Sequence, residues 1–195
     1  MDKNAFMKTD SMTSEMKWNE YFFELAKTIS TKSKDSTKIG CLIEKDHSII
    51  STGYNGFPVG VIDSPFLKGD PEKPIEINPR LQRPLKYFYT AHAEENAIAF
   101  AARNGVSTLN SSIYIYGMAP CSRCARLIIQ SGIKHVYAIM AVTKDSMKRW
   151  EEEMDITVEM FEESGIFYNF FEKNYLNLIK TPVCYRHQQT KHTGD

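Results

Sequence analysis

The chain has 195 residues, of which 42% are hydrophobic and 25% are charged. This length and composition predict one globular domain with a hydrophobic core of its own. Its 24 basic and 24 acidic side chains cancel, so no overall field favours nucleic acid or an anionic membrane, and a small-molecule substrate is the simpler expectation.

The sequence contains no apolar run long enough for a membrane span, and its first fifteen residues lack the apolar core of a signal peptide. We therefore expect a cytoplasmic protein. Of the four cysteines, Cys41 lies in an apolar stretch and Cys184 in a polar tail. Nothing in the spacing of the cysteines indicates a disulfide framework.

Residues 1–15 are polar and show no consistent period, so we expect a flexible N-terminal arm before a domain at 16–172. Apolar residues then recur at spacings of three and four, which predicts an amphipathic first helix whose stripe packs in the core rather than stacking on bases. The stripe consists of Trp18, Tyr21, Phe22, Leu25 and Ile29. Apolar strands at 39–44 and 49–54 follow and should pair as an antiparallel hairpin.

Two further segments are predicted to decorate the domain. Residues 59–85 carry five prolines and are too long for an ordinary connection, which predicts a functional flap. The aromatic residues at 86–89 then wall a site or pack under that flap. In the polar tail at 173–195, Cys184, His187 and His192 lie close together. Since no fourth ligand is identified, we expect exposed side chains there, with a separate zinc site as the alternative.

The second half of the chain alternates helices and strands. Helices are predicted at 91–104, over the cysteine-bearing segment that ends near Gly132, and at 143–164. Strands are predicted at 112–116, 133–142 and 166–171. This order favours parallel pairing with right-handed crossovers and helices on both faces of the sheet. We therefore predict an α/β fold, a three-layer α/β/α sandwich.

The spacing of His92, Cys121 and Cys124 indicates a zinc site. One neutral imidazole and two thiolates supply the three protein ligands of a hydrolytic zinc site, which keeps its fourth position open for water. The two cysteines would share one face of a helix, with Pro120 suited to its first turn. There the helix dipole favours thiolate over thiol. Sulfur ligands select zinc over magnesium or calcium, and a redox pair is the alternative for the cysteines alone.

Glu94 lies two residues after His92 and is not needed as a ligand. It is therefore free to act as general acid and base beside a water whose pKa zinc lowers toward neutrality. The pattern H-x-E followed by P-C-x-x-C is the signature of zinc-dependent nucleobase deaminases, and the chain matches it at every stated residue. On a pyrimidine, Glu94 would carry the water proton first to N3 and then to the amine that leaves C4.

Over residues 18–171 the chain resembles the cytidine/deoxycytidylate deaminase superfamily and, within it, is most similar to the deoxycytidylate (dCMP) deaminases. The resemblance rests on short motifs along the chain. They are Ser33-Lys34-Asp35, Gly53-Tyr54-Asn55-Gly56-Phe57-Pro58, His92-Ala93-Glu94-Glu95-Asn96-Ala97-Ile98, Pro120-Cys121-Ser122-Arg123-Cys124-Ala125 and Ile128-Ile129-Gln130-Ser131-Gly132-Ile133. The resemblance implies a mixed five-stranded sheet of cytidine-deaminase type, zinc as the cofactor, and hydrolysis of dCMP to dUMP and ammonia in pyrimidine deoxynucleotide metabolism.

The resemblance also implies roles for residues outside the zinc set. Asn55 would bind the sugar hydroxyl and the backbone N–H of Ala93 the base carbonyl, while Phe100 and Arg103 would shape the substrate pocket. Many dCMP deaminases are hexamers that dCTP activates and dTTP inhibits. A homo-oligomer, hexamer or dimer, and an effector or phosphate site at Lys34 and Asn55 are therefore expected.

The sequence leaves alternatives open. The substrate could be another cytosine nucleotide or nucleoside, or a tRNA adenosine, although the neutral net charge speaks against a tRNA-binding surface. A non-catalytic module stabilised by zinc is a second alternative, but structural zinc sites usually close with four protein ligands. Several basic residues are candidates to contact a substrate phosphate. They are Lys34, Arg80, Arg83, Lys86, Arg103 and Arg123.

Overall fold

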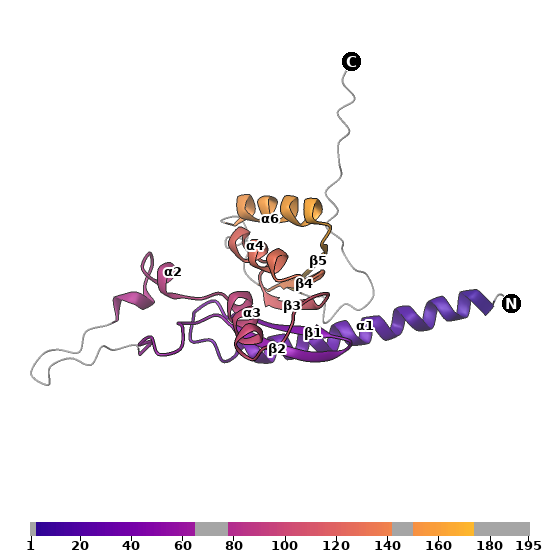
Figure 1. The fold of residues 1–195 in the computed structure, drawn as a ribbon, viewed down its shortest axis with the longest axis horizontal. Coiled ribbons are helices and arrows are strands. Elements are labelled where there is room, and N and C mark those ends of the chain that lie inside the picture. Colours follow the sequence, from indigo (N-terminus) through magenta and orange to yellow (C-terminus); the bar gives the residue numbers. More distant parts are fainter. Residues whose placement is uncertain (1–2, 65–77, 142–149, 174–195) are drawn as a thin grey trace, which may run out of the picture.

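The computed structural model describes residues 3–64, 78–141 and 150–173, with side chains described from residue 16 onward. Its helices are arranged around one β-sheet (Figure 1). In chain order they are α1 (Lys3–Ser30), β1 (Gly40–Lys45), β2 (Ser48–Tyr54), the 3-10 helix η1 (Pro79–Leu81), α2 (Lys86–Tyr89), α3 (Ala93–Arg103), β3 (Ser112–Gly117), α4 (Ser122–Gln130), β4 (His135–Met140), α6 (Glu151–Ser164) and β5 (Phe167–Glu172). Within the described ranges, no helix is both long and apolar enough to cross a membrane.

The sheet has five strands in the order β2-β1-β3-β4-β5. β1 is antiparallel to both β2 and β3, whereas β3, β4 and β5 run parallel to one another. Asp46 and His47 connect β1 to β2 with positive φ angles of 53° and 60°, as a two-residue type I′ hairpin turn requires. The predicted hairpin and the mixed sheet are thus confirmed.

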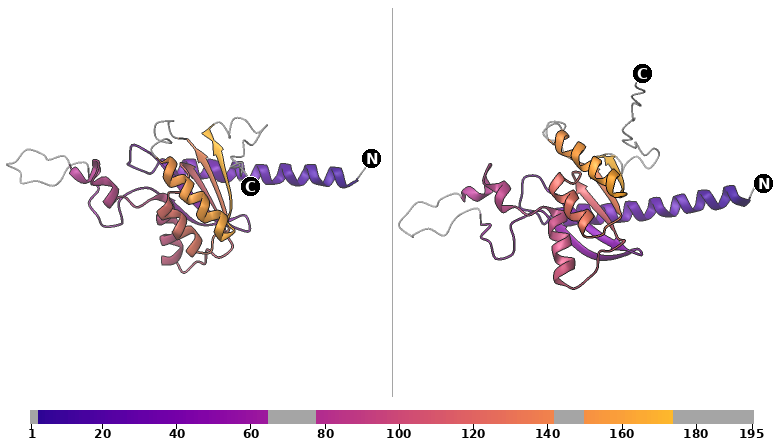
Figure 2. Two further views of the ribbon diagram at one scale, coloured as in Figure 1. Left: turned by 90° about the horizontal axis from the view of Figure 1, so that it is seen from above. Right: turned by 45° about the horizontal axis from the view of Figure 1, so that its top comes forward.

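The two faces of the sheet carry separate cores, because successive strand residues point to opposite sides. On one face, Ile113 and Ile115 of β3 belong to a cluster with residues of α3, α4 and α6, such as Phe161. On the other face, Tyr114 packs with Phe22 of α1. Figure 2 shows the same arrangement, with α1 alone along one side of the sheet. The predicted three-layer α/β/α sandwich is therefore confirmed.

The first helix begins earlier than predicted. Residues 3–15, for which the sequence predicts an irregular arm, continue the helix that ends at Ser30. No Gly or Pro interrupts residues 3–30, so the backbone meets no helix breaker over this length. The N-terminal part of α1 extends beyond the sheet in Figures 1 and 2. A segment that packs against no sheet needs no apolar stripe, which explains why periodicity did not reveal it.

The face that α1 buries matches the predicted stripe in part, since Leu25 and Ile29 pack against the same cluster as the buried Phe22. Phe22 and Ala26 are buried, whereas Trp18 and Tyr21 are 36% and 50% exposed. The helix approaches β1 closely at a glycine: a Cβ at Gly40 would lie 2.3 Å from the carbonyl oxygen of Ala26. This approach brings small residues into the contact, and counting large apolar residues did not detect them.

The predicted flap is anchored at its base. Residues 65–77 lie outside the described part of the chain, and so do residues 174–195 with Cys184, His187 and His192. Beside the flap segment, the buried Asn78 donates hydrogen bonds to the carbonyl oxygens of Ser64 (3.0 Å) and Ile62 (3.4 Å). Gly56 and Ala91 exchange backbone hydrogen bonds of 3.1 and 2.9 Å. This bridge returns the chain to the end of β2 before α3 begins.

Gly53 sets how closely α3 packs against β2. A Cβ at this position would lie 2.2 Å from the carbonyl oxygen of Ala93 and 2.5 Å from the backbone nitrogen of Ala97. Both contacts are with backbone atoms of the helix, so a side chain could be accommodated only if α3 moved. Since Glu94 lies on the same turn of α3, such a movement would displace residues that line the site described below.

We predict that Gly53→Ala lowers the free energy of unfolding by about 1–3 kcal/mol, because overpacking forces backbone shifts. Urea denaturation of the purified variant measures this change. Gly56→Ala is the matched control, since a Cβ at Gly56 meets only side-chain atoms of Tyr54 at 3.8 Å or more. Equal stability of the Gly53→Ala variant and the unmodified protein would contradict the close packing of α3 on β2.

Candidate active site

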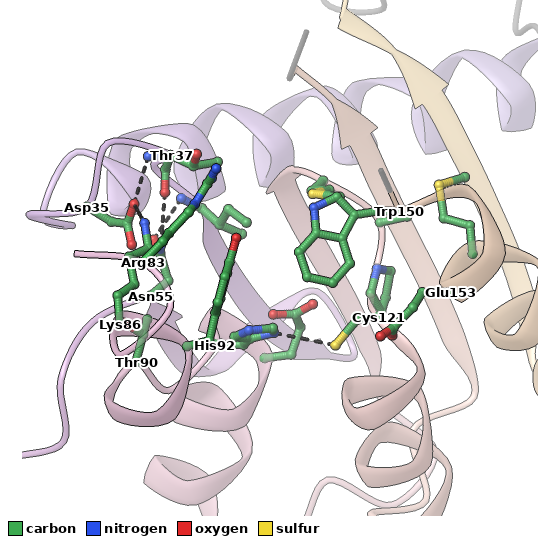
Figure 3. A pocket seen from close by; sticks show the side chains of 17 residues that line it. Asp35, Thr37, Asn55, Arg83, Lys86, Thr90, His92, Cys121, Trp150 and Glu153 are labelled. Carbon is green, nitrogen blue, oxygen red and sulfur yellow. Dashed lines mark hydrogen bonds and ion pairs between the residues drawn. The ribbon is translucent and has the colours of Figure 1, made fainter. Parts of the chain in front are cut away.

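The structure brings the three predicted ligands together. The Nδ1 atom of His92 lies 3.5 Å from the sulfur of Cys121 and 3.4 Å from the sulfur of Cys124. All three ligand atoms lie within 4.8 Å of one another. Among the described residues, one group of at least three His, Cys, Asp or Glu side chains is close enough together to hold a metal ion, and it consists of these three ligands. Figure 3 shows His92 and Cys121 facing each other at the floor of a cavity.

The ligands stand at helix starts, slightly before the positions that the sequence predicts. His92 is the N-cap of α3 and Cys121 is the N-cap of α4. Pro120 therefore precedes the helix instead of occupying its first turn. His92 and Cys121 both have extended backbone angles, which turn their side chains toward the site. Cys124, one turn into α4, completes the set.

One of the three ligands has a pKa that makes it a thiolate at neutral pH, and the other two hold protons that zinc displaces when it binds. A hydrogen bond from Cys124 has the largest influence on Cys121 and, together with the hydrogen bond to His92, outweighs burial and lowers the pKa of Cys121 to about 3. The same bond and burial raise the pKa of Cys124. Burial lowers the pKa of His92, but Cys121 and Glu94 outweigh it and raise that pKa to about 9. Zinc takes nitrogen and thiolate sulfur as ligands and releases such protons as it binds, so this donor set fits the metal.

Glu94 lies beside the ligands without belonging to them. It sits in the first turn of α3 and is 3% exposed. Burial is the main influence that raises the pKa of its carboxyl to about 7, although His92 opposes the change. A carboxyl with this pKa exchanges a proton readily near neutral pH. Its position and its pKa both suit the general acid and base role predicted from the sequence.

A cavity of about 100 Å³ opens above His92 and Glu94. Five stretches of chain supply its walls, and Figure 3 shows their side chains converging. The lining residues are Asp35, Thr37, Ile39, Asn55, Arg83, Lys86, Tyr87, Thr90, His92, Glu94, Met118, Ala119, Pro120, Cys121, Trp150, Glu153 and Met154. The sequence did not single out Thr37, Trp150 or Glu153. No local pattern marks them, because the loop before β1 and the start of α6 reach the cavity only through tertiary packing.

One wall of the cavity is polar and strongly tied together. Lys86 forms a 2.5 Å ion pair with Asp35, and the two side chains are 14% and 8% exposed. Burial opposes ionisation of Asp35, but Lys86 and the backbone N–H of Thr37 lower its pKa overall. Asn55 accepts a hydrogen bond from the Ile39 N–H (2.9 Å) and donates one to the Thr37 carbonyl (2.8 Å). This wall is thus fixed in place.

Arg83 differs from the other basic candidates for a phosphate contact. It lines the cavity and lies over the ring of Tyr87 at 5.6 Å, with no carboxylate partner in the described part of the chain. Lys34 instead pairs with Asp63 at 2.7 Å. It lines a second cavity of about 500 Å³ on the neighbouring surface.

Phe100, Arg103 and Arg123 are not part of the cavity lining, although the Arg123 guanidinium lies 3.5 Å from Nε2 of His92. Phe100 and Arg103 contact each other at 5.7 Å further along α3. A helix rises about 1.5 Å per residue, so they lie roughly 9 and 14 Å along the axis from Glu94. The structure therefore does not place them in the pocket within a single chain. Arg123 pairs with Glu95 at 3.4 Å.

Arg80 and Ala93 are the remaining residues of the predicted site. Arg80 lies over the Tyr89 ring at 5.0 Å and does not line the cavity of the metal ligands. Ala93 is buried at the first position of α3, where backbone N–H groups lack partners within the helix. Its place between His92 and Glu94 keeps it next to the cavity floor.

Comparison with known proteins supports this reading of the site. Residues 16–140 match the sequence profile of the cytidine and deoxycytidylate deaminase zinc-binding region. An uncharacterized deaminase of the luxG 3′ region in Aliivibrio fischeri is 38% identical over 77% of this chain and 90% of its own length. Deoxycytidylate deaminase of Mus musculus is 31% identical over 84% of this chain and 85% of its own.

A solved structure shares the fold. The dCMP deaminase of cyanophage S-TIM5, solved in complex with dCMP and dUMP, superimposes with a TM-score of 0.56 at 23% identity. The match covers 78% of this chain and 95% of the phage chain. The mixed five-stranded sheet and its covering helices are therefore shared with a known structure.

We predict that Cys124→Ser lowers zinc affinity by more than about 100-fold, since losing a ligand costs more than losing a residue that only supports one. Competition with a chromophoric chelator measures the affinity, and elemental analysis gives the zinc content. Cys41→Ala is the matched control because Cys41 is buried in β1 outside the ligand group. Unchanged zinc binding in the Cys124→Ser variant would refute the ligand assignment.

Proposed function

Since the chain belongs to the cytidine and deoxycytidylate deaminase family, whose zinc-binding region it matches over residues 16–140, we propose that it hydrolyses dCMP to dUMP and ammonia. One observation carries this proposal: a buried carboxyl, Glu94, stands beside three zinc ligands at the floor of a cavity. Relatives named deoxycytidylate deaminase support the choice of substrate. The phage neighbour was solved with dCMP and dUMP bound.

Glu94 moves the protons in the proposed reaction. Zinc, when bound, acts as a Lewis acid that lowers the pKa of water toward neutrality. Glu94 takes a proton from the attacking water and delivers it to N3 of cytosine, which makes C4 electrophilic. The water oxygen bonds to C4, and Glu94 takes the remaining proton from this oxygen and passes it to the amine. The C4–N bond then breaks as the C4=O bond of the product forms. One water is consumed and one ammonia is released.

The walls of the cavity orient the nucleotide. We assign the backbone N–H of Ala93 to the base carbonyl and the side chain of Asn55 to the sugar hydroxyl. The Asn55 amide nitrogen carries a second N–H besides the one donated to Thr37. Arg83 is assigned to the phosphate, because it is the cavity arginine without a carboxylate partner in the described residues. A guanidinium can bind two phosphate oxygens at once.

Regulation by dCTP or dTTP belongs to the same proposal. The second cavity, of about 500 Å³, is lined by three lysines together with aromatic residues. The lysines are Lys32, Lys34 and Lys86. Lys34 and Lys86 pair with Asp63 and Asp35 of the same lining. Lys32 therefore adds the net positive charge that, beside the aromatic side chains, suits a nucleoside triphosphate. Lys86 lines both cavities, so a ligand in the second would act on the wall of the first. A homo-oligomer, hexamer or dimer, is proposed from the family resemblance.

We expect Glu94→Gln to lower kcat for dCMP by about 10²–10⁴-fold, which is the usual contribution of general acid and base catalysis. Zinc content should stay the same because Glu94 is not one of the three ligands. Ammonia release and elemental analysis measure the two quantities. Glu159→Gln, an exposed change on α6, is the control. Full activity of the Glu94→Gln variant would eliminate the proposed mechanism.

We expect Arg83→Gln to lower kcat/KM for dCMP by about 10–100-fold, as the loss of a hydrogen-bonded charge pair implies, and to leave deoxycytidine turnover unchanged. Assays with dCMP, CMP, deoxycytidine and dCTP make the comparison. Arg80→Gln is the control, since Arg80 is a nearby arginine outside the cavity. An equal loss for dCMP and deoxycytidine would contradict the assignment, and preference for an unphosphorylated substrate would contradict the proposed function itself.

A further inference from the structure

Helix α6 holds the loop that carries Cys121. The Glu153 carboxylate accepts hydrogen bonds from the Ser122 backbone N–H (3.1 Å) and from the Ser122 hydroxyl (2.8 Å). One turn later, the hydroxyl of Thr157 donates to the carbonyl oxygen of Pro120 at 3.1 Å. Thr157 is fully buried. Both contacts thus join one face of α6 to the two residues that flank the metal ligand.

These contacts fix the backbone on each side of Cys121. The Pro120 carbonyl belongs to the peptide group before Cys121, and the Ser122 N–H belongs to the peptide group after it. Two planar peptide groups determine φ and ψ of the residue between them. The observed values for Cys121, −76° and 168°, set the direction in which its sulfur leaves the backbone. By binding both peptide groups, α6 determines where that sulfur lies.

The start of α4 explains why a residue from another helix is needed. An N-cap side chain commonly accepts a hydrogen bond from the first turn of its helix. Cys121 occupies the N-cap of α4 and makes no such bond, because its sulfur faces His92. The N–H of Ser122, the first residue of α4, is beyond the reach of an N-cap side chain and has no acceptor within the helix. The Glu153 carboxylate supplies one, and its negative charge is favourable at a helix N-terminus.

The other side of the metal site is supported differently. Glu95 accepts a hydrogen bond from the backbone N–H of His92 at 2.6 Å and pairs with Arg123 of α4 at 3.4 Å. His92 is thus held by α3 and α4, while the backbone around Cys121 is held by α6. Trp150, just before the start of α6, lines the substrate cavity together with Glu153. Helix α6 therefore contributes to the metal site and to the cavity wall at once.

We propose that Glu153 and Thr157 are positioning residues that set the zinc affinity of the site by fixing the backbone around Cys121. The inference rests on the zinc site used by the proposed function, but it concerns metal affinity and does not depend on the identity of the substrate. Residues that orient metal ligands in this way typically change affinity by about 10–100-fold when they are removed. The same range is expected here.

Two pairs of variants test the proposal. Glu153→Ala and Thr157→Val remove the hydrogen-bonding groups, whereas Glu153→Gln retains an acceptor oxygen and Thr157→Ser retains the hydroxyl. Chelator competition gives the zinc affinity, and the absorption of the cobalt-substituted protein reports the cobalt–thiolate bonds. We expect the first pair to bind zinc about 10–100-fold more weakly with altered cobalt spectra, and the second pair to match the unmodified protein. Glu152→Ala, an exposed neighbour on α6, is the control.

Three outcomes would overturn the proposal. They are unchanged affinity in both Glu153→Ala and Thr157→Val, equal losses in the conservative variants, or loss of affinity that follows a loss of thermal stability in every variant. Glu153 is only partly buried, so Glu153→Ala provides the measurement even if Thr157→Val fails to fold. The zinc and cobalt measurements are made without substrate, so they do not depend on the proposed function. Failure of dCMP turnover with normal zinc binding would count against the proposed function and leave this inference intact.

Discussion

The site depends on one geometrical constraint: β2 and β3 run in the same direction, because each is antiparallel to β1. A helix that follows each strand therefore starts at the same edge of the sheet. The bridge between Gly56 and Ala91 brings the chain back to that edge after the flap, so α3 begins there with His92. α4 begins there with Cys121. The convergence of two helix starts, far apart in the sequence, produces the ligand set.

The use of helix starts as a metal site has an electrostatic consequence. Two carboxylates satisfy backbone N–H groups at these helix starts: Glu95 accepts from His92, and Glu153 accepts from Ser122. Glu94 is buried among these groups at a cost in solvation, which its raised pKa reflects. Two thiolates and a divalent zinc ion balance in charge. Zinc thus compensates for burying the thiolates, and the carboxyl is left as the group that exchanges protons.

The sequence predicted those features that local patterns encode. The hairpin, the parallel pairing of the later strands and the ligand set follow from alternation, turn residues and motif spacing. The family resemblance implied the mixed five-stranded sheet, and the structure confirms all of these. Features that depend on packing at a distance could not be predicted. Trp150 and Glu153 reach the cavity because α6 packs on α4. Helix α1 approaches β1 closely because Gly40 has no side chain at the point of contact. Phe100 carried a role implied by resemblance alone, and in this chain it lies outside the cavity.

The central claim is that three protein ligands hold zinc and leave one position for water. X-ray absorption spectroscopy at the zinc edge of the zinc-loaded full chain tests it most directly. The account predicts two sulfur atoms at about 2.3 Å and two nitrogen or oxygen atoms at about 2.0–2.1 Å, with the signal of one imidazole. A third or fourth sulfur, or a second imidazole, would show a closed structural site and contradict a catalytic one.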